Sequence, residues 1–437
     1  MAKRTVIRGA QVVTMDEALG DFRSANIHVE NGAIVAVGPS LDSTDAEVID
    51  GSGMIALPGI IDAHTCLWQT VLRGYVPDLW PGAYYSAFLP LRQRFTAEDN
   101  FHAAYVGGFE MLSYGTTTVV DYCHDIRGPG YADASIEALR TTGIRHLFTH
   151  SFMSVSPDDF PGSSDRFDEA RRVYDRFHDP AGLTTIGFGV DSIGAPGLEK
   201  QVAFARALKA PSCIHVNETG TIHRLHAMGL LGPDLLVIHG NLITNVELEL
   251  MAEARAPICF TPTADVQGTP ADVVRRAMDR GVDVVFGCDI PCSVASDTIG
   301  QLRVMFNVQG FLDGAMERSF SSVVGRRPQV RPGLPLLTPR RLIETATIVA
   351  ARVLGLDDRI GSLTPGKRAD IVLIRKGPFG DSVVDDACAH VLLQTSPRDI
   401  DTVMVDGEIR MKAGMLVGYD RDKADAMIRS SRRRILT

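Results

Sequence analysis

The stretch LPGIIDAHTCLWQT, residues 57–70, decides how this chain is interpreted. Its apolar pair Ile60 and Ile61 leads to His64 and Cys66, which are two residues apart. Side chains two apart on a β-strand point to the same face, so we expect His64 and Cys66 to project together from the end of one strand. An imidazole and a thiol that converge on one place indicate a metal site or an activated nucleophile.

After this strand the sequence alternates between short apolar segments and helical patterns. Seven further segments have the β-branched composition of buried strands, namely 116–122, 144–150, 184–190, 212–218, 234–240, 257–262 and 282–289. Eight strand–helix units in about 250 residues predict a closed (β/α)₈ TIM barrel. The alternative is an open doubly wound sheet, but no glycine-rich phosphate loop follows any predicted strand.

Helix start and stop signals support the same alternation. Thr96 with Asp99 and the capping-box pair Thr244 and Glu247 mark helix beginnings. Thr269 precedes a proline at a first helical position, and Gly281 occupies a helix stop. A further single helix is predicted over residues 338–356.

The two ends of the chain differ from this middle part. Residues 1–56 and 360–437 contain short β-branched segments between turns, including an Asn-Gly hairpin signal at residues 31–32. We therefore expect a small β-sandwich-like domain formed by the N- and C-terminal segments, beside a barrel spanning residues 57–359.

Composition limits the classes of partner. The chain has 437 residues, with 44 basic and 53 acidic side chains and a net charge of −9, which argues against a nucleic-acid-binding protein. The basic run at residues 432–434 is predicted to be a solvated tail. No signal peptide or membrane-length apolar run is visible, and the seven cysteines lack paired short spacing. The prediction is a cytoplasmic protein with reduced thiols that binds a small molecule rather than a membrane.

Polar residues capable of acid–base chemistry or metal binding close many of the predicted strands. In a TIM barrel the catalytic groups lie at these C-terminal strand ends. The residues are His64, Cys66, Asp121, Cys123, His124, His150, His215, Asn217, Glu218, His239, Cys288 and Asp289. Such clustering is rarely needed for packing alone, so it predicts an active site.

Several short motifs give this pattern a family resemblance. They are HVNE at 215–218, IHG at 238–240, GCD at 287–289 and GSLTPGKRADIVLI at 361–374, in addition to PGIIDAH at 58–64. In this order the chain, from about residue 5 to 418, resembles the amidohydrolase superfamily, in the branch of cytosine deaminase and the chlorotriazine hydrolases. One position departs from the resemblance, because that family has His-x-His where this chain has Cys66 as the second residue.

The resemblance implies a metal-dependent hydrolase. One divalent ion, zinc or alternatively iron, would be bound by His64, His215, Asp289 and the position of Cys66, and would lower the pKa of a bound water toward about 7. Glu218, His239 and Asp289 would supply proton transfer and charge stabilisation. The implied reaction is hydrolytic deamination, or related C–N or C–Cl hydrolysis, of a nitrogen heterocycle, with ring-amide opening as the alternative and a homo-oligomer as the expected assembly.

Four residues are predicted to bind the substrate. The amide of Gln69 would recognise a carbonyl or ring nitrogen, as the family's Gln at this place is thought to do. Trp68 and Trp80 would cover an apolar pocket. His223 lies on the predicted helix after the fifth strand.

Cys66 leaves three interpretations open. It can be a thiolate ligand of the metal, or the metal can be bound by His64, His215, His239 and Asp289 without it. In the third interpretation the site has no metal, and catalysis uses the His, Glu and Asp residues together with Cys66, which can act directly as a nucleophile. A non-catalytic binding barrel is a separate possibility, against which the acid–base residues argue.

Overall fold

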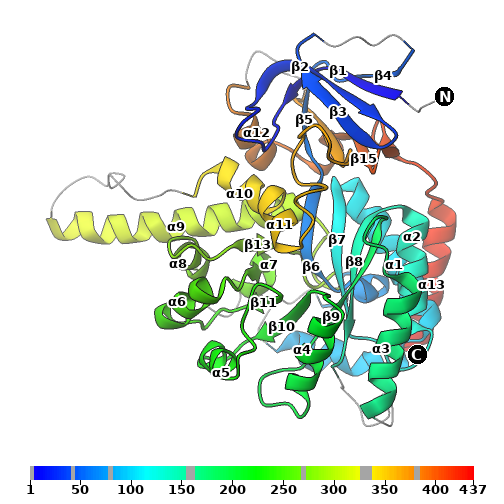
Figure 1. The fold of residues 1–437 in the computed structure, drawn as a ribbon, viewed down its shortest axis with the longest axis vertical. Helices are drawn as coiled ribbons and strands as arrows, with labels where there is room; N and C mark the ends of the chain where they lie inside the picture. The colour runs from blue at the N-terminus through cyan, green and yellow to red at the C-terminus, as the bar shows by residue number, and fades with distance from the viewer. Residues whose placement is uncertain are drawn as a thin grey trace.

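The computed structural model describes residues 4–40, 45–76, 82–153, 163–266, 272–324, 337–377 and 384–437. They form two parts, a parallel barrel surrounded by helices and a mixed sheet at one end of it (Figure 1). Both parts were expected from the alternation of segments along the sequence.

The barrel has eight parallel strands that follow one another in chain order around the sheet. They are β6 (Ile60–Thr65), β7 (Thr116–Cys123), β8 (Arg145–Ser151), β9 (Thr184–Gly189), β10 (Ser212–Val216), β11 (Leu235–His239), β12 (Ile258–Phe260) and β13 (Val284–Phe286). A parallel bridge between Thr65 and Asp289 joins the first strand to the segment after the last. The predicted (β/α)₈ barrel is therefore confirmed.

Burial explains why these strands are nearly continuous apolar runs. Every residue of β6 and β7 is buried, as expected for parallel strands that are covered on both faces. Gly287 is required where the barrel closes, because a Cβ atom there would lie 2.2 Å from the carbonyl oxygen of His64.

Helices cover the outside of the barrel (Figure 1). They are α1 (Ala97–Ser113), α2 (Tyr131–Thr142), α3 (Ser163–Phe177), α4 (Leu198–Ala207), α5 (Thr221–Ala227), α6 (Asn245–Ala254), α7 (Pro262–Asp265), α8 (Val273–Met278) and α9 (Thr298–Val324). The helix cap predicted at Thr96 and the capping box predicted at Thr244 are both present, and Thr96 also forms a capping box, with Asp99. The predicted helix start at Thr269 lies outside the described residues.

The single helix predicted over residues 338–356 is wrong. Two helices occupy this region, α10 (Pro339–Thr345) and α11 (Ile348–Val353), separated by Ala346 and Thr347. The carbonyl oxygen of Ala346 accepts a 2.8 Å hydrogen bond from the backbone N–H of Ile61 in β6. This tertiary hydrogen bond occurs where the helix is interrupted, and the helical sequence pattern does not indicate it.

The second part is one nine-stranded mixed sheet built from both ends of the chain. Its strands are β1 (Arg4–Val12), β2 (Phe22–Glu30), β3 (Ala33–Gly38), β4 (Glu47–Asp50), β5 (Met54–Pro58), β14 (Ile371–Arg375), β15 (Ile400–Val405), β16 (Glu408–Lys412) and β17 (Met415–Leu416). Asn31 and Gly32 have φ of 51° and 80°, as a tight hairpin turn requires. A bridge from Ala33 to Arg368 shows that the sheet curls back toward its other half. The exact domain boundaries, 1–56 with 360–437 and 57–359, remain a proposal.

The C-terminal segment is not the solvated tail that its basic run suggested. It forms helix α13 (Arg421–Leu436), which contacts α1 (Figure 1). Arg432 donates to the backbone carbonyls of Val71 and Arg73, and Arg434 pairs with the buried carboxylate of Asp99. These contacts tie the end of the chain to η1 (Leu67–Leu72), the turn that follows the first barrel strand, and to the start of α1.

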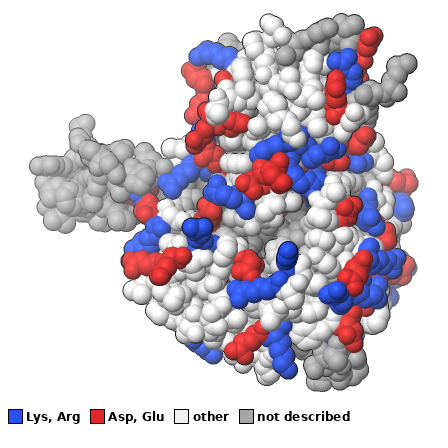
Figure 2. Space-filling view, in the orientation of Figure 1, with Lys and Arg blue, Asp and Glu red and all other residues white. Residues whose placement is uncertain are grey.

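The remaining short elements complete the fold. They are η2 (Tyr84–Phe88) and η3 (Leu89–Arg94) in the segment before α1, and α12 (Ala387–Leu393) and η5 (Pro397–Asp399) before β15. On the face shown in Figure 2, acidic and basic side chains are interspersed. Among the described residues, no helix combines the length and apolar character needed to cross a membrane. All seven cysteines are free and buried.

Candidate active site

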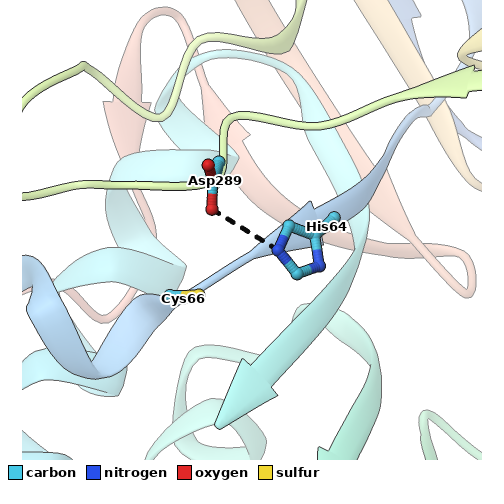
Figure 3. A group of neighbouring side chains, drawn as sticks. All are labelled: His64, Cys66 and Asp289. Carbon is cyan, nitrogen blue, oxygen red and sulfur yellow. Dashed lines mark ion pairs between the residues drawn. The ribbon is translucent and has the colours of Figure 1, made fainter. Parts of the chain in front are cut away.

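Three of the predicted metal ligands meet at the C-terminal end of the barrel. One donor atom each of His64, Cys66 and Asp289 lies within 4.8 Å of the others, and all three residues are buried. Figure 3 shows His64 and Asp289 facing one another, with His64 Nε2 3.4 Å from Asp289 Oδ1. Cys66 lies on the segment directly after β6 (Figure 3).

The backbone at this place is fixed by a buried carboxylate, Asp62. It accepts hydrogen bonds from the backbone N–H of His64 at 3.1 Å and of Cys288 at 3.0 Å. It also accepts from the hydroxyls of Thr65 and Thr298. Asp62 therefore connects the end of the first strand to the end of the eighth.

Two further imidazoles surround the same space. The ring of His215 lies 5.0 Å from that of His64 and 5.2 Å from that of His239, measured between centroids. Burial, together with the neighbouring His64 and His239, holds the pKa of His215 well below its usual range, so this ring is neutral. Neutral imidazole is the form that binds metal ions.

The donor set fits a divalent ion. Nδ1 of His64 and Nδ1 of His215 have no hydrogen-bond partner among the residues that the structure describes, and Nε2 of His64 has only its 3.4 Å contact with Asp289 Oδ1. Buried polar atoms normally have partners, and imidazole nitrogens beside a carboxylate are typical zinc ligands. Burial and the carboxylates of Asp289 and Asp121 raise the pKa of the Cys66 thiol, so binding through Cys66 would require release of its proton.

Asp289 has the electrostatics of a proton acceptor. Burial raises the pKa of this carboxyl, but the hydrogen bond with His64 and the charge of His239 outweigh that effect and hold the pKa below its usual value. Its backbone φ of 64° lies in the left-handed region, which is unusual for a residue other than glycine. The strand end therefore holds an ionised carboxylate in a constrained position.

His239 differs from His215 and His124 in having a raised pKa, which favours its positively charged form. Its Nδ1 lies 3.0 Å from Asp265 Oδ1 and 3.2 Å from Thr261 Oγ1. Burial alone would lower the pKa of His239, but Asp265 outweighs it and raises the pKa to about 9. The sequence interpretation missed Asp265. The Thr-Pro helix start at residues 261–262, with an acidic residue in the first turn, was a signal that could have found it.

A hydrogen-bonded group lies on the other side of Cys66. His124, at the end of β7, has Nδ1 3.8 Å from Cys66 Sγ and 3.4 Å from Trp68 Nε1, and Nε2 3.1 Å from Tyr84 Oη. Gln69 Nε2 donates to the same Tyr84 oxygen at 3.1 Å. Burial, reinforced by Arg92, lowers the pKa of His124 to about 3, so its ring is neutral.

Tyr122, which the sequence interpretation also missed, lines the site. Its ring lies 4.7 Å from that of His215 and 5.2 Å from that of His64. Its hydroxyl accepts a hydrogen bond from Ser151 at 3.1 Å. The TTTVVDY segment that contains it was recognised only as a buried strand.

The predicted substrate-binding residues occupy different environments. Trp68 is buried against Phe88 and Phe95, and Gln69 is fully buried. His223 is half exposed on α5, 3.7 Å from Glu247. Glu218 is exposed two residues beyond the end of β10. Trp80 lies outside the described residues.

Comparison with known proteins gives a consistent result. The sequence model of the Amidohydrolase family matches residues 55–410. A 5-methylthioadenosine/S-adenosylhomocysteine deaminase of Symbiobacterium thermophilum is 28% identical, with 93% of each chain covered. A 5'-deoxyadenosine deaminase of Methanosarcina mazei is 24% identical, covering 96% of this chain and 95% of the relative.

Two solved structures share the fold. The atrazine chlorohydrolase TrzN of Arthrobacter aurescens, complexed with zinc, has a TM-score of 0.83 at 24% identity, covering 98% of this chain and 99% of TrzN. An adenosine deaminase from Xanthomonas campestris with bound zinc has a TM-score of 0.84 at 20% identity, covering 99% of this chain and 98% of the other.

Proposed function

The chain belongs to the amidohydrolase family, and we propose that it hydrolytically removes an amino group from a nitrogen heterocycle. Family membership confirms the expected enzyme class, an amidohydrolase-type hydrolase acting on carbon–nitrogen bonds other than peptide bonds. The observation that carries the more specific proposal is the convergence of His64, His215, His239 and Asp289 at the barrel mouth. The curated relatives are deaminases of adenine nucleosides, so an aminopurine nucleoside is the first substrate class to test.

We propose zinc as the cofactor. His64, Asp289 and Cys66 would bind it, with His215 as a further ligand, and the ion when bound would supply Lewis acidity and activate a water molecule. The zinc present in the two solved structures supports this choice of metal. The raised pKa of the Cys66 thiol argues against its use as a free nucleophile, because a nucleophilic cysteine needs its thiolate form.

The protein's own groups divide the proton transfers among them. Asp289 is ionised and can take a proton from the attacking water. His239 is protonated and can donate a hydrogen bond to negative charge that develops on the substrate. Glu218 would carry a proton to the ring or to the leaving amine, which is the role that the HVNE motif suggests.

A second candidate reaction is hydrolysis of a carbon–chlorine bond on a triazine. The similarity to the atrazine chlorohydrolase TrzN favours it. The same acid–base groups would serve, because both reactions replace a ring substituent by hydroxide. The homo-oligomer expected from the family resemblance remains a prediction.

The proposal is tested with purified protein loaded with zinc. Release of ammonia or chloride is measured for a panel of aminopurine nucleosides, cytosine and chlorotriazines. Glu218→Gln should reduce kcat by about 10²–10⁴-fold, as for removal of a general acid–base group. Glu249→Gln, an exposed acid on α6, is the matched control and should have no effect. Absence of turnover across the panel, or full activity of Glu218→Gln, would contradict the proposal.

A further inference from the structure

The hydrogen-bond directions around His124 can be assigned from donor chemistry. The indole nitrogen of Trp68 is only a donor, so its 3.4 Å contact makes Nδ1 of His124 an acceptor. A neutral imidazole that accepts at Nδ1 carries its hydrogen on Nε2. That hydrogen is directed at Tyr84 Oη, 3.1 Å away.

Tyr84 Oη receives a second hydrogen bond, from Gln69 Nε2 at 3.1 Å. Both acceptor positions of the phenol oxygen are therefore used. With these two donors, no acceptor for the hydrogen of Tyr84 is found among the residues that the structure describes, so that hydrogen can be donated to a ligand. Trp68 and Gln69 are buried and belong to the same turn, η1.

The position of Tyr84 is suited to contact with a substrate. Tyr84 begins η2, a π-helical turn, and such turns are frequent at functional sites. Its ring stacks on the buried ring of Phe88, with centroids 5.4 Å apart and planes 19° apart. The imidazole of His124 lies between Cys66 and Tyr84, so the phenol is one ring width from the candidate metal ligands.

We propose that Tyr84 is a substrate-positioning residue that donates its phenolic hydrogen to an acceptor atom of the heterocycle, a ring nitrogen or a carbonyl oxygen. His124 and Gln69 act through Tyr84 by occupying the lone pairs of its oxygen, and Trp68 fixes the tautomer of His124 that makes this possible. The expected direct contact between Gln69 and the substrate is replaced by this relay. The proposal rests on the proposed function in one respect, that the ligand is a nitrogen heterocycle.

The test removes one acceptor atom from the ligand and the hydroxyl of Tyr84 from the protein, separately and together. Steady-state kinetics and equilibrium binding are measured for the best heterocycle of the panel and for analogues that each lack one acceptor, either a ring nitrogen replaced by C–H or a carbonyl oxygen that has been removed. Tyr84→Phe should raise KM about 10-fold while changing kcat less than about 3-fold, as expected for loss of one uniform binding contact. For the analogue that lacks the contacted acceptor atom, the KM of the wild type should rise by the same factor. Tyr84→Phe should not raise the KM for that analogue any further.

A control variant and a second test variant accompany Tyr84→Phe. Tyr85→Phe removes a neighbouring hydroxyl from a ring that is 63% exposed and should behave as the wild type. Gln69→Glu provides a carboxylate that would accept the Tyr84 hydrogen, so it should reproduce the Tyr84→Phe pattern. Thermal unfolding of each variant establishes that it is folded.

The outcomes separate the two proposals. Suppose that the wild type turns over the heterocycle, but that each analogue raises KM by the same factor in the wild type and in Tyr84→Phe. The Tyr84 assignment is then overturned and the proposed reaction stands. If no heterocycle is turned over but the binding measurements show the expected pattern, the reaction fails and the Tyr84 assignment stands. If no heterocycle binds, both are overturned.

Discussion

The Sγ atom of Cys66 lies 3.8 Å from Nδ1 of His124, an imidazole supplied by the neighbouring strand. This contact does not activate the thiol, because Trp68 also donates to that nitrogen and the ring is neutral. Burial and the nearby carboxylates raise the pKa of Cys66, so the thiol keeps its proton while no ion is bound. To act as the proposed metal ligand, Cys66 would have to lose this proton when the ion binds.

The first prediction concerns metal affinity. Cys66→His should bind zinc about 10- to 100-fold more tightly than the wild type at pH 7, since no thiol proton has to be displaced. Cys66→Ala should bind zinc more weakly, and its affinity should depend less on pH. Competition with a chromogenic chelator measures both effects. Cys388→Ala, on α12, is the control, and identical affinity of Cys66→Ala and wild type would remove Cys66 from the ligand set.

The second prediction concerns the pair His239 and Asp265. The folded pKa of His239, about 9, lies above its ordinary value of 6.5, so the pair stabilises the fold fully below pH 6.5 and the effect is lost as pH rises through about 9. Asp265→Asn should lower the free energy of unfolding at pH 6 by on the order of 2 kcal/mol and have a smaller effect at pH 10. It should also move the basic limb of the kcat/KM profile to lower pH.

Thermal unfolding at both pH values and a pH–rate profile check this second prediction. Asp272→Asn, which removes a half-exposed acid from the beginning of α8, should change neither measurement. An unchanged basic limb in Asp265→Asn would show that His239 does not need its proton for the reaction.

The third prediction concerns a buried ion pair at the contact between the barrel and the mixed sheet. Arg145 at the start of β8 makes two hydrogen bonds, of 2.9 and 3.0 Å, to the buried carboxylate of Asp370. Asp370→Ala leaves the buried guanidinium without its main partner and should lower the free energy of unfolding by about 3 kcal/mol in urea titrations. Asp283→Ala breaks a half-exposed pair with Arg352 and should cost about 0–1 kcal/mol. Equal effects of the two variants would show that burial of the Arg145 pair does not matter.

The fourth prediction concerns helix α13. Replacing Arg432 and Arg434 by Ala removes contacts to η1 and to Asp99, so hydrogen exchange should increase in residues 67–72 and at the start of α1. Because η1 carries Gln69 and Trp68, kcat/KM should fall about 10-fold. Arg429→Ala, whose side chain is 68% exposed, is the control. Unchanged hydrogen exchange in η1 would show that helix α13 does not stabilise the turn that carries Gln69 and Trp68.

Several features of the fold could be predicted because they depend on neighbouring residues. The strand ending at His64 and the capping boxes at Thr96 and Thr244 follow from local composition and short-range hydrogen bonds. The interruption at Ala346 could not be predicted in this way, because its carbonyl is hydrogen-bonded to a strand almost 300 residues earlier. Asp265 had a local signal in the Thr-Pro helix start, but its effect on the pKa of His239 depends on the distance between the two residues, which the sequence does not give.

The sequence by itself determined the barrel, the family and the strand ends where the chemistry lies, since hydrophobic periodicity and short motifs are properties of contiguous residues. Only the tertiary structure decided the protonation state of each side chain at those strand ends. Closure of the barrel buries Cys66 and places it beside His124, Asp121 and Asp289, and burial without a cationic partner keeps a thiol protonated. Closure also places Asp265 against His239, where a nearby carboxylate keeps an imidazole protonated. Protonation and hydrogen-bond direction depend on distances between residues far apart in the chain, and these distances exist only after folding.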